Sequence, residues 1–355
     1  MTPAPNTLSE PGSQPKGRAS IYDVAAHAGV SAQTVSRVAN GQTNVRPTTR
    51  DRVLASIEAL GYRPNSAARN LKSGKFRSIG FVTFNLATLG NEQTLNAVAA
   101  ASEQAGYTTT LLPVTDPTKL DVAGAFNRLE EQAVDGIILV MSAEVGSLDE
   151  LRVTVGLPLV IVDSDAKLPY TIVDTDQEQG AKLAVQHLLD LGHRDIAHVS
   201  GPEISFSARR RAETYRRVMA EAGLEPRPVL VGDWSALSAL ARARELFADG
   251  PPPSAIFAGN DQMALGVVHA IRERGWRVPE DISVVGFDDA EEAAVSWPAL
   301  TTVHQNFDQV GRNATSLLLS LIGGAPDTRT KVLIPTHLVV RDSTGPARSG
   351  SVGGA

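Results

Sequence analysis

Gln33 and Arg37 stand four positions apart in the short segment "GVSAQTVSRVANG", residues 29–41. Side chains four residues apart share one face of an α-helix. In the DNA major groove a glutamine amide can pair with adenine, and an arginine guanidinium can pair with guanine. The small side chain of Ala32 lets the start of such a helix come close to the bases and contact a thymine methyl. These residue types favour a helix that reads DNA bases.

The hydroxyl groups of Ser31, Thr34 and Ser36 in the same segment are suited to phosphate oxygens. The alternative interpretation is a solvated surface helix in a small bundle. Residues 1–77 hold 11 Lys and Arg against 4 Asp and Glu, whereas the whole chain has a formal net charge of −6. The N-terminal region is thus basic (+7) and the remainder acidic (−13), which indicates that one module meets a polyanion.

Three short helices must hold this segment in place. Ser20 is predicted to cap the first helix and Ser31 the second, while Pro47 opens a third that ends at Gly61. The apolar side chains expected to face inward recur at helical spacing: Ile21, Val24, Ala25, Ala28, Val35, Val38, Val53, Leu54, Ile57 and Leu60. Residues 19–63 are therefore predicted to form a helix-turn-helix domain.

The segments that flank this domain are poor in apolar residues. Residues 1–18 are predicted to be a disordered N-terminus, and residues 344–355 a disordered tail. In the hinge, residues 64–77, Asn65 can cap one short helix that runs through Lys72. Because a helix of this length is not stable alone in water, the hinge is either a plain linker or a segment that orders on a partner.

Residues 78–343 have the texture of an α/β domain. Apolar runs of strand length, such as "SIGFVTF" and "DGIILVM", alternate with stretches of helix length. This pattern is typical of parallel sheets flanked by helices, and it repeats after a crossover near Asp174–Thr175. We therefore predict two lobes with a cleft between them. Since ligands bind beyond the carboxyl ends of such strands, Asp163, Asn260 and Asp288 are candidate binding residues.

The composition excludes several classes of protein. The chain has no cysteine, which excludes a disulfide framework, thiolate metal sites and a cysteine nucleophile. Its longest apolar runs are far shorter than the ~20 residues that a membrane-spanning helix needs. The N-terminus lacks the apolar segment of a secretory signal. We therefore expect a cytoplasmic protein that does not enter a membrane.

Motifs of enzymes are also missing. The sequence has no Gly-x-Gly-x-x-Gly pattern, no Walker loop and no serine elbow. His193 and His198 have no carboxylate or cysteine at metal-binding spacing. The carboxylates of Asp174 and Asp176 are expected to cap the following helix rather than to do chemistry. We therefore expect no enzymatic activity, no cofactor and no metal.

Seven segments carry a resemblance to a known family. They are, in chain order, "IYDVAAHAGVSAQTVSRVANG", "RVLASIEALGYRPN", "AARNLKSG", "DLGHRDIAHVSGP", "AIFAGNDQMALG", "RVPEDISVVGFDD" and "PALTTVHQNF". With them the chain resembles the LacI/GalR family of bacterial transcription regulators from about residue 20 to residue 343. The resemblance implies a homodimer whose heads read a palindromic operator. It also implies a core shaped like periplasmic sugar-binding proteins, in which a small effector closes the cleft and loosens DNA binding.

The resemblance assigns DNA contacts as well. It implies that Ala32, Gln33 and Arg37 are the main base readers. It further implies that the hinge helix forms only on DNA, where Leu71, with Ala68 and Lys72 nearby, enters the minor groove and kinks the duplex. The chain ends in "STGPARSGSVGGA", which has no leucine heptad for a coiled coil, so we expect a dimer rather than a tetramer.

The resemblance places the effector in the cleft. The residues that it implies for effector binding are Asp163, Arg211, Trp234, Asn260, Asp288 and Phe307. Planar polar groups suit paired sugar hydroxyls, and an aromatic ring suits the apolar face of a sugar. Two alternatives stay open, because Trp234 could be core packing and Asp288 could cap a turn beside Asp289.

The identity of the effector is less sharply defined. The segments "GDWSA", "AGNDQMALG" and "DISVVG" are especially close to the family's lactose-responsive member, which favours a galactoside-like inducer. Phe84 and Asn85 replace a small polar pair there, so another sugar, a phosphosugar, a purine or a corepressor remains an alternative. A transport-type sugar-binding protein and an enzyme using the cleft carboxylates are the competing classes. The missing signal peptide argues against the first, and the missing acid/base pair argues against the second.

Overall fold

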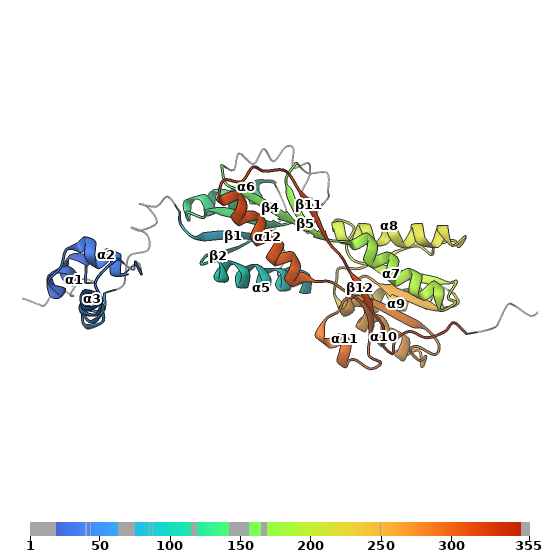
Figure 1. Cartoon of the computed structure of the whole chain (residues 1–355). Helices are drawn as coiled ribbons and strands as arrows, with labels where there is room; N and C mark the ends of the chain where they lie inside the picture. The colour runs from blue at the N-terminus through green and yellow to red at the C-terminus, as the bar shows by residue number, and fades with distance from the viewer. Residues whose placement is uncertain are drawn as a thin grey trace, which may run out of the picture. The chain divides into compact units, whose positions relative to one another are not determined.

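The computed structural model describes residues 19–62 without 40 and 43, 75–114 without 85 and 87, 119–141, 156–164, 169–248 and 250–348. The chain divides into two units, Met1–Lys75 and Phe76–Ala355, which are considered separately (Figure 1). The predicted minor-groove residues Ala68, Leu71 and Lys72 lie outside the described residues. None of the helices in the described ranges is long and apolar enough to cross a membrane.

In its described residues the first unit contains three helices, α1 (Ile21–Ala28), α2 (Ala32–Ala39) and α3 (Pro47–Ala59). Ser20 and Asp23 form a capping box on α1: the Asp23 carboxylate accepts from the Ser20 backbone N–H at 2.8 Å. Ser31 caps α2 by accepting from the Thr34 backbone N–H at 3.2 Å. The predicted helix-turn-helix domain is confirmed.

A small apolar core holds the three helices together. Val24, Val35 and Val53 each come from a different helix and are 0% exposed. The prediction for α3 is wrong at Leu54, which is 48% exposed, because Ser56 takes the inward position instead. The Ser56 hydroxyl is satisfied there, since it donates to the Arg52 carbonyl at 2.8 Å and contacts Nδ1 of His27 at 3.0 Å.

Two six-stranded sheets form the second unit. The first sheet contains β1 (Ser78–Thr83), β2 (Thr108–Pro113), β3 (Gly136–Val140), β4 (Leu159–Val162), β5 (Thr171–Thr175) and β11 (Lys331–Ile334). Its order is β11-β5-β4-β3-β1-β2, and every pair is parallel. The second sheet contains β6 (Ile196–Ser200), β7 (Leu230–Val231), β8 (Ala255–Ala258), β9 (Ser283–Asp288), β10 (Thr301–His304) and β12 (His337–Val339). Its order is β12-β10-β9-β8-β6-β7, and β12 runs antiparallel to β10.

Helices pack on both sheets, which gives two α/β lobes (Figure 1). The helices of the first lobe are α5 (Leu89–Gln104), α6 (Lys119–Glu131) and α12 (Phe307–Ile322). Those of the second lobe are α7 (Gln177–Asp190), α8 (Phe206–Glu221), α9 (Ala236–Leu246), α10 (Asp261–Glu273) and α11 (Glu291–Val295). Strands β3, β4 and β9 are buried along their whole length, as expected for sheets covered on both faces. The predicted two-lobed α/β fold is confirmed.

The alternation of elements suggested that the two lobes are consecutive halves of the chain. The structure shows that they are not. The chain enters the second lobe after β5, returns to the first as α12 and β11, and re-enters the second as β12. The apolar segment "VLIPTHLVV" has the length of a single strand, but it is divided between the two sheets at Pro335. Proline cannot donate to a strand ladder, which explains the break. Strand β5 itself was not predicted, because only Ile172 and Val173 in it are apolar.

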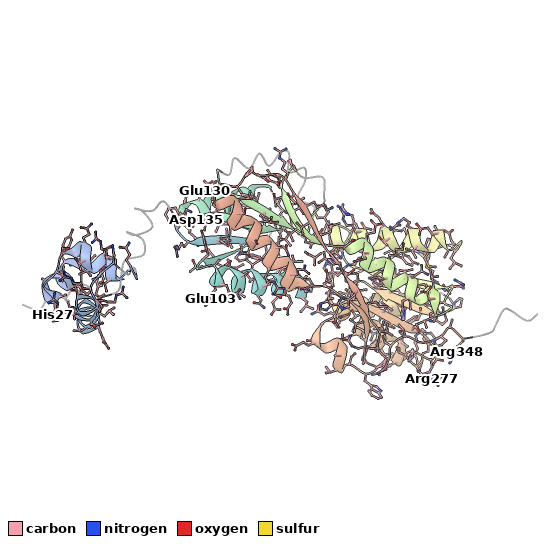
Figure 2. The ribbon with its side chains drawn as sticks, in the orientation of Figure 1. His27, Glu103, Glu130, Asp135, Arg277 and Arg348 are labelled. Carbon is pink, nitrogen blue, oxygen red and sulfur yellow. The ribbon has the colours of Figure 1, made fainter. Side chains whose placement is uncertain are left out.

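Both ends of the second unit reach further than predicted. The carboxylate of Asp135 accepts from the backbone N–H groups of Phe76 and Arg77, so these two residues belong to the core. Predicted disorder of the tail is wrong for residues 344–348, which are hydrogen-bonded to the second lobe. Arg348 ends this stretch by pairing with Asp281, near Arg277 (Figure 2).

Candidate functional site

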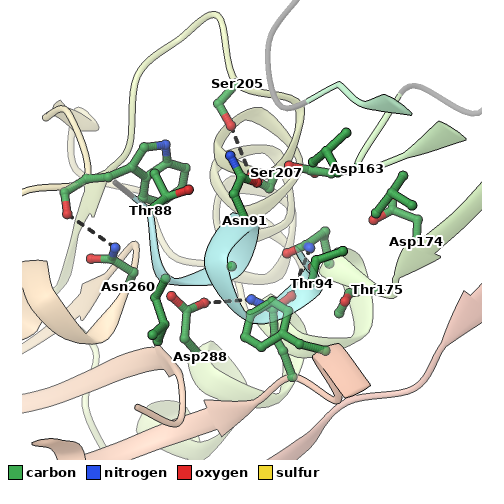
Figure 3. Close-up of a pocket in the computed structure, with 18 of the residues that line it drawn as sticks. Thr88, Asn91, Thr94, Asp163, Asp174, Thr175, Ser205, Ser207, Asn260 and Asp288 are labelled. Carbon is green, nitrogen blue, oxygen red and sulfur yellow. Dashed lines mark hydrogen bonds between the residues drawn. The ribbon is translucent and has the colours of Figure 1, made fainter. Parts of the chain in front are cut away.

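A cavity of about 230 Å³ lies in the second unit, where the carboxyl ends of strands from both lobes meet (Figure 3). Six predicted effector-binding residues line it: Asp163, Arg211, Trp234, Asn260, Asp288 and Phe307. The wall also contains polar residues that were not predicted to bind the effector: Asn91, Asp174, Gln177, Ser205, Ser207 and Gln305. Asp163 comes from the first lobe and Asp288 from the second, so a bound ligand would touch both lobes.

Arg211 is the cation in the wall of this cavity. It lies on the inward face of α8 and is 3% exposed, whereas its neighbours Arg209 and Arg210 are only half-buried. Its Nε donates to Gln177 Oε1 at 2.9 Å, and its Nη1 donates to the carbonyl of Gly259. The guanidinium carbon lies 3.6 Å from the centroid of the Phe287 ring. Burial lowers the pKa of Arg211, but the surrounding carboxylates oppose this.

Asp288 faces Arg211 from the last position of β9. Its Oδ1 lies 3.9 Å from Nη2 of Arg211 and accepts from Gln305 Nε2 at 2.6 Å. Burial raises the pKa of Asp288 to about 6, against the effect of Arg211. The neighbouring Asp289 turns away, because it pairs with Arg341 at 2.7 Å and His304 at 3.0 Å. Of the two carboxylates, Asp288 is therefore the one that a ligand in the cavity can reach.

The indole of Trp234 lies flat against glycine backbone. A Cβ atom on Gly201 would come within 2.4 Å of the indole, and one on Gly259 would come within 3.2 Å. Asn260 holds this loop: its Nδ2 donates to the Trp234 carbonyl at 3.2 Å, while its Oδ1 caps α10 by accepting from Met263. Trp234 therefore packs on the core of the second lobe and also lines the cavity.

Two carboxylates lie at the other side of the cavity. Asp163 follows β4 in a left-handed conformation with φ of 54°, and Asp174 lies within β5 (Figure 3). Burial raises the pKa of Asp163 to about 6, and burial together with the charge of Asp163 raises the pKa of Asp174 well above its usual value. The prediction that both Asp174 and Asp176 cap the next helix is half wrong. Asp176 caps α7 through the Gln179 backbone N–H at 2.9 Å, whereas Asp174 lines the cavity.

The surface of α2 carries the predicted base readers. Gln33 and Arg37 are exposed, while Ala32 is half-buried and packs against the core of the domain. The hydroxyls of Ser31 and Thr34 contact each other at 3.0 Å, and Ser36 is half-buried. Sequence reasoning missed Tyr22 on α1, a large aromatic residue that is 74% exposed. An exposed aromatic on a basic domain is a further candidate for DNA contact.

The histidines and carboxylates of the described ranges form no group of three that could hold a metal ion. His193 contacts Ser254 Oγ and the Gly345 carbonyl, both at 3.0 Å. His198 lies in the core, where its Nδ1 contacts the Phe257 carbonyl at 2.8 Å and burial lowers its pKa to about 4. Both side chains are structural.

Comparison with known proteins matches this architecture. Residues 20–65 match the bacterial regulatory proteins of the lacI family, and residues 185–344 match the periplasmic binding protein-like domain. The chain is 35% identical to the lactose operon repressor of Escherichia coli (strain K12) over 327 residues, which is 91% of this chain and 90% of that protein. The chain belongs to the lacI family. It is therefore a DNA-binding transcription repressor of that family.

This lacI-family repressor is also similar to a second repressor in sequence and to a solved repressor in structure. It is 36% identical over 333 residues to the HTH-type transcriptional repressor PurR of Pasteurella multocida (strain Pm70), covering 92% of this chain and 98% of that protein. Its structure is similar to that of the lac repressor dimer bound to operator and the anti-inducer ONPF, with a TM-score of 0.86. That match covers 92% of this chain and 99% of the lac repressor chain at 35% identity.

Proposed function

We propose that this lacI-family repressor binds a palindromic operator as a homodimer and is released from it by a small sugar, of galactoside type, in the cavity. In each head, Gln33 and Arg37 pair with base edges, and Ala32 contacts a thymine methyl. Ser31, Thr34 and Ser36 contact phosphates, while the hinge residues Ala68, Leu71 and Lys72 enter the minor groove. Because a bacterial repressor acts on DNA inside the cell, we expect it to work in the cytoplasm.

The observation that carries the effector proposal is the buried pair of Arg211 and Asp288 beside the indole of Trp234. A guanidinium offers planar donors and a carboxylate offers acceptors, which together match the hydroxyl groups of a sugar. The indole covers the apolar face of the ring. Small-molecule sites combine apolar walls with a few fixed polar groups in this way.

Binding can control DNA affinity because the wall comes from both lobes. A ligand that touches Asp163 in the first lobe and Asp288 in the second favours one arrangement of the lobes over others. A ligand shifts such a balance only by its difference in affinity for the two states. We propose that the state with bound sugar is the one that holds the operator weakly.

Dimerisation is supported by apolar side chains on the surface of the second lobe. Val295 and Trp297 are each 83% exposed and adjoin Leu265 and Val268 in a shallow groove. Contiguous exposed apolar surface of this kind marks an interaction site. A similar chain, the lac repressor, has been solved as a dimer on its operator. We propose that a second copy of this chain covers the groove.

A thermal-shift screen of sugars, phosphosugars and purine bases tests the effector proposal. A specific ligand at 100 times its Kd stabilises the folded state by about 2.7 kcal/mol. The chemical class of the effector is therefore identified by the compounds that raise Tm. We expect a galactoside to raise Tm and to release the operator in a gel shift. A shift with purine bases and none with sugars would assign a different effector. Tighter operator binding with the sugar would make the sugar a corepressor.

A further inference from the structure

Asp163 and Asp174 occupy neighbouring positions at the ends of two adjacent strands. Strands β4 and β5 are parallel, with Val162 opposite Val173, so the next pair along is Asp163 and Asp174. Figure 3 shows the two carboxylates on one side of the cavity, with Asn260 and Asp288 on the other. Two carboxylates held close together repel each other when both are ionised, and the charge of Asp163 accordingly acts to raise the pKa of Asp174. The pair is therefore unfavourable for the fold of this lobe.

The two carboxylates are also poorly solvated. Asp174 is 5% exposed, and Oδ1 of Asp163 is buried with no hydrogen-bond partner among the residues that the structure describes. The left-handed backbone of Asp163, with φ of 54°, is a further unfavourable feature for a residue with a side chain. Unfavourable backbone conformations of this kind cluster at ligand sites.

The nearby cations do not balance the pair. Among the carboxylates, Asp288 has the largest electrostatic effect on Arg211. The Arg211 guanidinium also donates to Gln177 and to the Gly259 carbonyl. The charge of Arg210 acts on both carboxylates, and that of Lys331 acts on Asp174. Burial outweighs all of these cations, because the pKa values of Asp163 and Asp174 are both raised. In the described wall of the cavity, three carboxylates face one guanidinium.

We propose that Asp163 and Asp174 hold the ammonium group of an amino sugar, an inference that rests on the sugar-effector function proposed above. An ammonium group has three donors and one positive charge, so it can satisfy both carboxylates and remove their repulsion. The ring hydroxyls then extend to Arg211 and Asp288 on the opposite side. The cavity, at about 230 Å³, is smaller than the ~300–1,000 Å³ pockets that hold drug-sized ligands, which suits a single sugar ring.

A divalent cation fits the pair less well than an ammonium group. Calcium takes six to eight oxygen ligands and magnesium takes six. In the described residues no third carboxylate or histidine joins Asp163 and Asp174 in a metal-binding group. The pair also lines a cavity that is large enough for a small organic molecule, whereas a metal site would surround the ion closely with ligands. An organic cation is therefore the better match.

Titration calorimetry of the full-length protein at pH 7 tests the inference. Galactosamine is compared with galactose, and glucosamine with glucose, because each pair differs only by an amino group in place of a hydroxyl. We expect one amino sugar to bind about 10- to 100-fold more tightly than its neutral parent. We also expect it to release protons at pH 6, measured in buffers of different ionisation enthalpy, because binding favours the ionised carboxylates.

The variant Asp174→Asn keeps the shape of the side chain and removes its charge. It should lose most of the preference for the amino sugar, measured as the ratio of the Kd of the amino sugar to that of its neutral parent. Glu103→Gln is the matched control, because it removes one negative charge from an exposed position of the same lobe. It should keep the full preference. If Asp174→Asn does not fold, the proton release of the wild-type protein still decides the question.

The outcomes separate this inference from the function on which it rests. Equal affinity for the amino sugar and its parent, without proton release, overturns the inference and leaves the sugar effector intact. Binding of no sugar at all overturns the sugar effector and this inference together. An unchanged amino-sugar preference in Asp174→Asn removes Asp174 from the proposed site.

Discussion

Arg211 on α8 holds its Nη2 atom 3.9 Å from Oδ1 of Asp288 at the end of β9, and the two side chains are only 4% and 9% exposed. Truncating one partner of a buried charge pair typically weakens binding by about 2–5 kcal/mol. We therefore expect Arg211→Ala to weaken effector binding by at least about 30-fold, measured by quenching or enhancement of Trp234 fluorescence.

The control for this prediction lies on the same helix. Arg217 is 42% exposed and pairs with Glu178 and Glu221 away from the cavity. Arg217→Ala should leave effector affinity unchanged, because exposed ion pairs contribute little. Equal losses in Arg211→Ala and Arg217→Ala would mean that the loss comes from damage to α8 and that Arg211 does not bind the effector.

Gly201→Ala should displace the indole of Trp234. The added Cβ would come within 2.4 Å of the ring, a distance that requires the indole to move. We expect effector affinity to fall about tenfold or more, with a shifted tryptophan emission spectrum in the free protein. Gly124→Ala is the matched control, because nothing lies within 4 Å of a Cβ at Gly124 on α6. Normal affinity in Gly201→Ala would show that the indole does not cover the sugar.

The stability of the core should report the raised pKa of Asp163. With a folded pKa of about 6 and an ordinary value of 3.8, the folded protein holds a proton that the unfolded chain has released between these pH values. The stabilisation from this carboxyl is complete below about pH 4 and is lost as pH rises through about 6. Asp163→Asn lacks this loss, so it should gain about 1–3 kcal/mol relative to the wild type between pH 4 and pH 7.

Urea denaturation of both proteins at pH 4, 5, 6 and 7 measures this difference. The difference is needed because buried His198, with its pKa lowered to about 4, changes wild-type stability with pH in the opposite direction. Glu103→Gln, an exposed charge removal, should show no such trend. A gap between Asp163→Asn and the wild type that stays constant from pH 4 to pH 7 would show that Asp163 titrates normally.

Arg37→Ala should change which sequences the head prefers. Its exposed guanidinium shares a face of α2 with Gln33, as base reading requires. We expect a loss of about 1–3 kcal/mol in operator binding and relaxed preference at one base pair of each half-site. Competition between operators with single base changes measures both effects. Uniform weakening on every DNA sequence would instead place Arg37 on a phosphate.

The sequence predicts the side chains of the site better than their surroundings. The family resemblance points to Arg211, and the structure explains why this residue and not its neighbour lines the cavity: α8 turns Arg211 inward and leaves Arg210 half-buried. Asp174 could not, because β5 has too few apolar residues to be recognised as a strand. Its pairing with Asp163 depends on the register of β4 and β5, which only the fold reveals.

Long-range connections escape local patterns for the same reason. The alternation of strands and helices predicts two lobes, but nothing local says that α12 and β11 return to the first lobe. On α3, the apolar Leu54 is exposed while Ser56 is buried, because His27 from α1 supplies a partner for the Ser56 hydroxyl. Such exchanges depend on contacts 29 residues apart in the sequence.

We propose above all that a ligand in the cavity controls the affinity of the helix-turn-helix domains for the operator. Operator retention in a gel shift, titrated with the effector found by the thermal-shift screen, tests it directly in the wild type and in Asp288→Ala. We expect both proteins to bind the operator equally without effector, and only the wild type to release it at effector concentrations up to about 30 times the wild-type midpoint. Release of Asp288→Ala at the wild-type midpoint would contradict the account, because the cavity would then not be where the effector acts.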